Sequence, residues 1–241
     1  MSYAVISDVH SNREALQTVL QEIEGKGIKD ILFLGDAVGY GPAPDECLET
    51  LVSACSVLIA GNHDWGAADK MGIGRFNPFA RLALGWTREV MKKGNLTLLK
   101  GLPLTAELRD KGAFLVHGSP KEPEKWQYLL TPEDAEENFP FFAQPLCFVG
   151  HSHLPFIIER TSEGDMTVHR NEATVTDGSR YIINPGSVGQ PRDGDPRASF
   201  AVVENNLITI RRVEYDIPKT QAEMRAAGLP EFLVERLERG W

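Results

Sequence analysis

The chain has 241 residues, of which 42% are hydrophobic, which suits one large α/β domain with a proper core. Its net charge is −9, and it has no cluster of Lys and Arg. Both features argue against a protein that binds the phosphate backbone of nucleic acid. No apolar run reaches the length of about eighteen residues that a membrane-spanning helix needs, so no such span is expected.

The N-terminal residues and the cysteines bear on the cellular compartment of the protein. Residues 1–6 lack the basic start and the long apolar stretch of a signal peptide. The cysteines, Cys47, Cys55 and Cys147, are odd in number and form no Cys-x-x-Cys pair. A reduced cytoplasm is the economical interpretation, so we expect a cytoplasmic protein with a single domain over residues 1–241.

Strands and helices alternate in the first half of the chain. Apolar runs predict strands at residues 3–7, 30–34 and 56–60. Helical spacing and helix-start signals predict helices at residues 12–24, 45–53 and 77–91. The strands run directly into polar residues, namely Asp8, Gly35-Asp36 and Gly61-Asn62. Because ligands of open α/β sheets lie beyond the carboxyl ends of the strands, we expect functional side chains at these positions.

The second half of the chain is richer in strands. Its apolar patterns predict strands at 104–108, 113–116 and 146–149, with a helix at 131–139. Further strands are predicted at 155–160, 166–170, 180–183, 199–204 and 207–215. Two short amphipathic helices close the chain, the second between Pro230 and Gly240. A mixed first half followed by a β-rich half predicts two packed sheets with helices outside.

Five of the six histidines lie in short clusters with Asp, Asn and Gly. In chain order these clusters are Asp8-Val9-His10, Gly35-Asp36, Gly61-Asn62-His63-Asp64, His117-Gly118 and Gly150-His151-Ser152-His153. Carboxylate oxygens mixed with imidazoles, without cysteine, are typical of a site for Mn, Fe, Zn or a similar divalent ion. Seven side chains are candidate ligands: Asp8, His10, Asp36, Asn62, His117, His151 and His153. Seven are too many for one ion and suit two ions that share a carboxylate.

In their order, these clusters resemble the signature of the calcineurin-like metallophosphoesterases, which is D-x-H, GD, GNH[DE], an isolated H and GH-x-H. Every element is present with no ligand replaced, and the chain is most similar to the compact prokaryotic branch. The resemblance implies a four-layer α-β-β-α sandwich of two mixed sheets flanked by helices. It also implies two divalent ions per chain, with manganese expected and iron, zinc, nickel or cobalt as alternatives.

The resemblance further implies a role for each matching residue. Asp8, His10 and His153 would bind one ion, Asn62, His117 and His151 the other, and Asp36 would bridge them. His63 would protonate the departing ester oxygen and be oriented by Asp64. The reaction implied is hydrolysis of a small phosphate ester, a phosphodiester in preference to a phosphomonoester, by attack of a hydroxide that bridges the two ions.

Three other residues are candidate substrate contacts. Asn12 follows the first motif at the expected start of a helix, where free N–H groups favour phosphate, although a helix cap explains it equally well. Tyr40 lies in the Gly-rich turn after Asp36 and is a candidate for the pocket wall. Arg192, which follows the loop of residues 184–189, is the best-placed phosphate clamp.

Two alternative functions stay open. A protein phosphatase or dinucleoside polyphosphate hydrolase of the superfamily usually extends the second motif to GDxxDRG, whereas this chain continues as Gly35-Asp36-Ala37-Val38-Gly39-Tyr40. The same fold also serves as a non-catalytic scaffold in which active-site histidines are substituted, but His63, His151 and His153 are all retained here. The expected partner is a small phosphoester, and the sequence does not predict an oligomeric state.

Overall fold

A computed structural model describes residues 2–241 and contains two six-stranded sheets. The strands of the first sheet are β1 (Ser2–Ile6), β2 (Ile31–Phe33), β3 (Val57–Leu58), β9 (Glu172–Thr174), β11 (Ala198–Glu204) and β12 (Leu207–Val213). The strands of the second sheet are β4 (Thr105–Leu108), β5 (Ala113–Val116), β6 (Leu146–Phe148), β7 (Phe156–Arg160), β8 (Met166–His169) and β10 (Arg180–Asn184). Their orders are β3-β2-β1-β11-β12-β9 and β4-β5-β6-β10-β7-β8, and both sheets mix parallel and antiparallel pairs.

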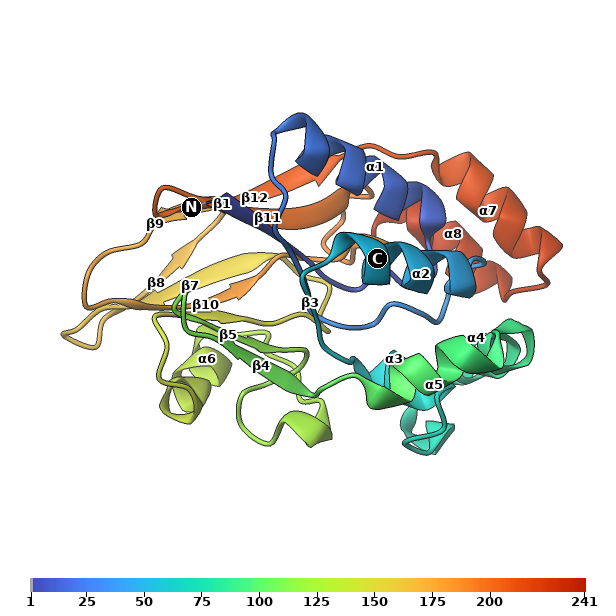
Figure 1. Cartoon of the computed structure of the whole chain (residues 1–241), viewed down its shortest axis with the longest axis horizontal. Coiled ribbons are helices and arrows are strands. Elements are labelled where there is room, and N and C mark those ends of the chain that lie inside the picture. Colours follow the sequence, from blue (N-terminus) through green and yellow to red (C-terminus); the bar gives the residue numbers. More distant parts are fainter. Residues whose placement is uncertain (1) are drawn as a thin grey trace.

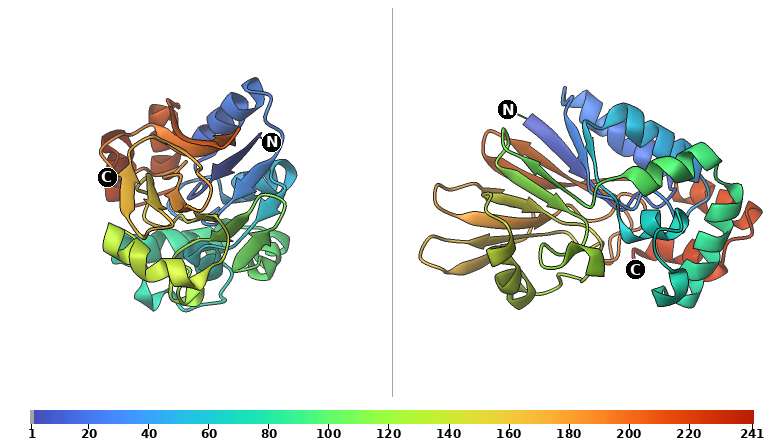
Figure 2. Two further views of the ribbon diagram at one scale, coloured as in Figure 1. Left: turned by 90° about the vertical axis from the view of Figure 1, so that its left-hand side faces the viewer. Right: turned by 60° about the horizontal axis from the view of Figure 1, so that its bottom comes forward.

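Helices cover the outer faces of the two sheets (Figure 1; Figure 2). They are α1 (Arg13–Gly25), α2 (Pro44–Ala54), α3 (Asn62–Ala67), α4 (Pro78–Val90), α5 (Lys93–Gly101), α6 (Pro132–Asn138), α7 (Ile217–Ala226) and α8 (Glu231–Arg239). Helices α1 and α2 lie on the first sheet, whereas α6 lies on the opposite side of the molecule against the second (Figure 1; Figure 2). The four-layer α-β-β-α arrangement predicted from the sequence is confirmed.

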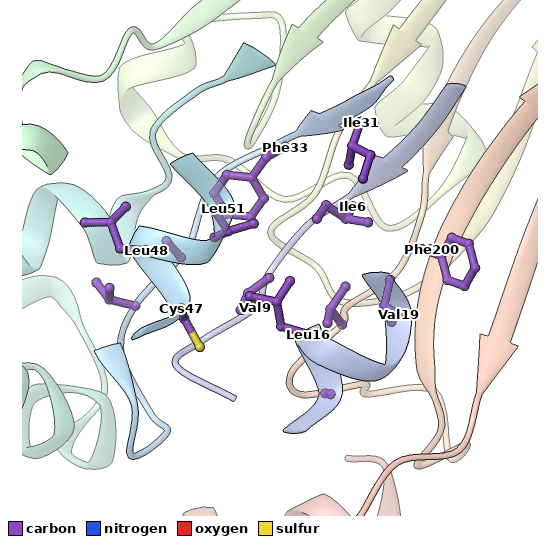
Figure 3. Packing of buried hydrophobic residues seen from close by; sticks show 14 of the residues in the cluster. Ile6, Val9, Leu16, Val19, Ile31, Phe33, Cys47, Leu48, Leu51 and Phe200 are labelled. Atoms are coloured by element: carbon purple, nitrogen blue, oxygen red, sulfur yellow. The ribbon is translucent and has the colours of Figure 1, made fainter. Parts of the chain in front are cut away.

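Alternation along single strands explains why both faces of each sheet are buried. In β1, Ala4 and Ile6 face α1 and α2, while Tyr3 and Val5 face the second sheet. Side chains at alternate positions of a strand point to opposite faces, so one apolar strand contributes to two layers of core. Figure 3 shows the outer layer, in which Ile6 and other residues of the first sheet pack against α1 and α2.

The alternating order of the first half and the β-rich second half agree with the sequence patterns. Helix α3, helix α5 and strand β9 are missed, because each gives a weak local signal. Helix α3 has 6 residues and contains a glycine, and β9 has only 3 residues. Helix α5 has glycine at two of its 9 positions, which lowers helix propensity. Among residues 2–241, no helix is both long and apolar enough to cross a membrane.

Phe200 tests the outer core layer. This side chain of β11 is fully buried against α1, so Phe200→Ala should lower the free energy of unfolding by about 3–5 kcal/mol through lost burial and a cavity. Phe141, which is 50% exposed, supplies the matched control, and Phe141→Ala should cost less than about 1 kcal/mol. Urea denaturation measures both values, and equal losses would contradict this description of the core.

Candidate metal centre

Polar residues that follow five different strands meet at one edge of the two sheets. Asp8, Asp36 and Asn62 come after β1, β2 and β3, which run parallel to one another. His117 follows β5, and the pair of histidines at 151 and 153 follows the parallel neighbour β6. None of the seven predicted ligands exposes more than 7% of its surface. Residues up to 145 positions apart in the chain, from Asp8 to His153, are therefore buried in one place.

Six of the seven side chains, all but Asn62, form two groups of converging atoms. In one group, Asp8 Oδ1 lies 3.3 Å from His153 Nε2 and 3.8 Å from His10 Nε2. In the other, Asp36 Oδ2 lies 3.2 Å from His117 Nε2, and His151 completes the group. Within each group the ligand atoms lie within 4.8 Å of one another. Asp36 Oδ2 is also 3.6 Å from His10 Nε2, which places this carboxylate between the groups.

Hydrogen bonds to main-chain carbonyls orient three of the imidazole rings. Nδ1 of His10 donates to the carbonyl of Val38 (3.1 Å), and Nδ1 of His117 donates to the carbonyl of Leu34 (2.9 Å). Nδ1 of His153 donates to the carbonyl of residue 190 (2.6 Å). A carbonyl only accepts, so each Nδ1 carries a proton, and in the neutral form of each ring Nε2 presents a lone pair to the centre.

The inward-facing atoms have no protein partner that would satisfy them. The Nε2 atoms of His10 and His153 face each other at 3.0 Å, which is repulsive for two lone pairs unless a cation or proton lies beside them. Asp8 Oδ1, Asn62 Oδ1 and His117 Nε2 are buried without any hydrogen-bond partner in the described residues. Buried polar atoms are normally paired. These donor atoms fit divalent metal ions in number and in chemical type.

The electrostatics of the cluster favour a bound cation. Burial alone would raise the pKa of Asp36, but the neighbouring imidazoles, led by His117, hold it well below its ordinary value. Burial lowers the pKa of His151 to about 3. Burial also opposes a charge on His117, yet Asp36 raises the pKa of this imidazole to about 9. The carboxylates thus remain ionised, and a metal ion would compete with the proton on His117.

The ligand loops adopt an unusual backbone conformation. Five of the seven predicted ligands have positive φ angles, namely Asp8 (53°), His10 (48°), Asp36 (60°), His151 (65°) and His153 (61°). Residues other than glycine rarely adopt this region, and such strain is concentrated at functional sites. The loops turn sharply enough to aim successive side chains at one point, at a cost that the surrounding fold must offset.

Gly61 allows the loops to approach each other closely. A Cβ at this position would collide with the carboxylate of Asp36, which lies directly against the glycine backbone. The backbone N–H of His63 donates to Asp36 Oδ1 (2.8 Å) from the same segment. The glycine of the third motif is therefore needed for the position of Asp36.

Asp64 positions the loop that carries Asp36. Its carboxylate accepts hydrogen bonds from four backbone N–H groups, those of Asp36 (2.8 Å), Ala37 (2.9 Å), Val38 (3.4 Å) and Gly61 (2.9 Å). Burial and the charge of Asp36 raise the pKa of Asp64 to about 7, while these N–H groups favour the ionised form. In residues 2–241 no hydrogen bond joins Asp64 to the ring of His63, so the contacts of Asp64 do not support the prediction that it orients His63.

His63 lines the same pocket as the ligands. Its ring centroid lies 4.7 Å from that of His10, 4.4 Å from that of Tyr40 and 5.0 Å from that of Phe76. Burial lowers the pKa of this imidazole to about 4. Its Nδ1 is buried without a partner in the described residues, beside Gly39, where a Cβ would collide with it. His63 also approaches His10 and Asp36 within the 4.8 Å spacing of a possible ligand group.

A pocket of about 330 Å³ opens over the cluster. Tyr40 and Arg192 line it, as the sequence predicted, but Asn12 does not. The side-chain oxygen of Asn12 caps α1 by accepting the N–H of Ala15 (3.1 Å), and its amide donates to the carbonyl of Gly189 (2.9 Å). The structure therefore assigns Asn12 to helix capping and not to the pocket.

Two segments that sequence reasoning missed supply most of the remaining wall. They contribute Met71, Arg75, Phe76, Asn77, Lys125, Trp126 and Tyr128. The ring of Tyr128 stacks on His151 with centroids 4.0 Å apart and planes 11° apart. These segments contain no motif, and only their position shortly after a ligand motif associates them with the site.

Comparison with known proteins gives matches over most of the chain. The model of the calcineurin-like phosphoesterase superfamily domain matches residues 1–206. The uncharacterized protein MJ0912 of Methanocaldococcus jannaschii is 44% identical, over 98% of this chain and 97% of that protein. A crystal structure of a metallophosphoesterase from Sphaerobacter thermophilus is 45% identical, with a TM-score of 0.87 and coverage of 100% of this chain and 99% of that chain. Phosphodiesterase YfcE of Escherichia coli is 25% identical, over 87% of this chain and 91% of that protein.

Asp64→Asn tests the positioning role of the buried carboxylate. An amide NH₂ cannot accept a hydrogen bond, so at least one backbone N–H of the Asp36 loop would lose its acceptor. We expect a loss of about 2–4 kcal/mol in the free energy of unfolding and a lower metal content. Asp134→Asn is the matched control, since Asp134 accepts two backbone N–H groups near the surface, where water can replace it. Unchanged metal content in Asp64→Asn, measured by elemental analysis, would contradict this role.

Proposed function

Because the chain belongs to the calcineurin-like phosphoesterase superfamily, we propose that it hydrolyses a small phosphate ester with two divalent ions held by the seven clustered side chains. The family resemblance drawn from the five motifs is confirmed, and the chain is a metal-dependent phosphoesterase. The observation that carries the proposal is the convergence of buried lone pairs that have no protein partner.

The proposed division of ligands follows the two groups of side chains. Asp8, His10 and His153 would hold one ion. His117, His151 and Asn62 would hold the other, with the unpaired Oδ1 of Asn62 supplying an oxygen. Asp36 is the proposed shared ligand, because its Oδ2 is 3.6 Å from His10 Nε2 and 3.2 Å from His117 Nε2.

The charges of the site suit an anionic substrate. When bound, two divalent ions neutralise phosphate oxygens and make a water acidic enough to attack phosphorus. Arg192 would bind a phosphate oxygen, because its Nε is buried without a partner in the described residues and its Nη2 is held by Gln190 Oε1 (2.8 Å). Its guanidinium carbon lies 5.7 Å from the ring centroid of Tyr40, which keeps the side chain over the pocket.

His63 is the proposed acid for the leaving group. It lines the pocket next to the ligands, within reach of an ester bound there. Its imidazole is neutral while the pocket is free of substrate, and an anionic phosphate beside it favours the protonated form. The proton would pass to the ester oxygen as the P–O bond breaks.

We further propose that the substrate is a phosphodiester and that the native ion is manganese. A phosphodiester is supported by the name of the Escherichia coli relative, phosphodiesterase YfcE. Manganese is supported by a donor set of carboxylate, amide and imidazole groups without thiolate, a set that iron and zinc also accept.

Asp36→Asn tests the dinuclear proposal. Removing one negative charge from the shared ligand should weaken both ions together, so metal content should fall from two ions per chain to fewer than one. Turnover of bis-p-nitrophenyl phosphate should drop at least about 100-fold, with an unchanged circular dichroism spectrum. Asp165→Asn, on an exposed turn, is the control. Two ions and near-normal turnover in Asp36→Asn would refute the proposal.

His63→Ala tests the proposed acid. General acid catalysis typically contributes about 10²–10⁴ in rate, and the contribution should be large for alkyl esters, whose alkoxides leave poorly. It should be small for p-nitrophenyl esters, because p-nitrophenolate departs unaided. We expect His63→Ala to keep both ions, to retain much of its activity on p-nitrophenyl esters and to lose far more on alkyl esters. Equal losses on both would instead assign His63 to phosphate positioning.

A further inference from the structure

A second hollow of about 450 Å³ adjoins the pocket over the metal centre. Its lining residues are Trp65, Met71, Gly72, Gly74, Arg75, Glu124 and Trp126. Met71, Arg75 and Trp126 line both the hollow and the pocket, so the two spaces meet at these side chains. A ligand with its phosphate at the metal centre can therefore extend over Trp126 into the hollow.

Two indole rings form a right-angled corner in this hollow. The ring centroids of Trp65 and Trp126 are 5.1 Å apart, and their planes are inclined by 86°. A planar ring in such a corner lies flat against one indole and presents its edge to the other, and both arrangements are favourable between aromatic groups. Trp126 also contacts the ring of His117, with centroids 5.9 Å apart, so the corner is fixed directly to the metal centre.

Two charged residues that line the hollow, Arg75 and Glu124, can bind a heterocycle that is attached to a phosphate. Arg75 is exposed and makes no hydrogen bond or ion pair with any other residue in the described range 2–241. A free planar guanidinium at the junction can stack on a ring or bind a phosphate oxygen. Glu124 also lines the hollow and offers an acceptor for an exocyclic amine.

From these contacts we infer that the hollow binds a nucleobase, and that the substrate is a phosphodiester with a nucleoside as one of its ester groups. Stacking of a base on aromatic side chains is tolerant of base identity, so the hollow selects a planar heterocycle and not one particular base. This inference rests on the proposed function, because it describes the substrate of the same site.

Gly74 allows the hollow to be filled without touching the metal centre. A Cβ at this position would meet nothing within 4 Å, and the residue does not have a positive φ angle. Because Gly74 lines the hollow, the ring of Gly74→Phe can occupy this space without backbone strain. Gly94→Phe is the matched control, because Gly94 is an exposed glycine of α5 with the same free surroundings and lines neither space.

Two methyl phosphodiesters measure the contribution of the base. One is the methyl ester of adenosine 5′-phosphate, and the other is its abasic analogue with a methoxy group in place of adenine. With manganese-loaded protein and ³¹P NMR, the wild type should show a kcat/KM at least about tenfold higher for the adenosine ester. Gly74→Phe should remove this preference and leave the abasic ester within about twofold, while Gly94→Phe keeps it. Equal rates in the wild type, or equal losses in Gly74→Phe, would overturn the inference.

Binding of adenosine tests the base site by a measurement that does not depend on catalytic turnover. Saturation-transfer NMR should detect adenosine on the wild type and on Gly94→Phe, with at least a fivefold weaker signal on Gly74→Phe. No signal on the wild type, or equal signals on all three proteins, would count against the base site. Adenosine binding without hydrolysis of any phosphoester would reject the proposed function and keep the base site.

Discussion

Burial of unpaired atoms of the candidate metal ligands is the constraint on which the rest of this structure depends. Carboxylates and imidazole lone pairs that face one another inside a protein are unfavourable without a cation. The fold nevertheless brings them together at the ends of β1, β2, β3, β5 and β6. Free energy from the two core layers on either side of the first sheet must offset this cost. A bound cation would remove much of this cost, and the packing of the surrounding domain must offset the rest.

The clustering of the candidate ligands could be predicted from sequence because metal chemistry restricts residue type. Only a few side chains bind hard or borderline divalent ions, and the ends of parallel strands bring such residues together. Asp8, Asp36 and Asn62 each stand where an apolar run ends, so their meeting point follows from the sheet topology. The two-sheet architecture could be predicted for a related reason, since alternation along single strands records which faces are buried.

The substrate pocket and the supporting groups could not be predicted in the same way. Residues 71–77 and 125–128 enter the pocket through single 3₁₀ turns and irregular backbone, which are too short for a periodic pattern to relate sequence to direction. Asp64 has the chemistry of a partner for His63, and adjacency in the sequence suggested that pairing. Its carboxylate instead accepts N–H groups of a loop 26–28 residues away, a distinction that depends on side-chain direction within a short helix. The same limit applies to Asn12, whose capping role depends on where α1 begins.

The orientation of the imidazoles has a consequence for the comparison of sequences. His10, His117 and His153 are held by the main-chain carbonyls of residues 38, 34 and 190. Every amino acid has a carbonyl group, so these hydrogen bonds do not depend on the side chains at the three positions, which are buried and constrained by packing. The course of the main chain therefore sets the direction of the rings, and the groups that orient them would leave no trace of their own in a comparison of sequences.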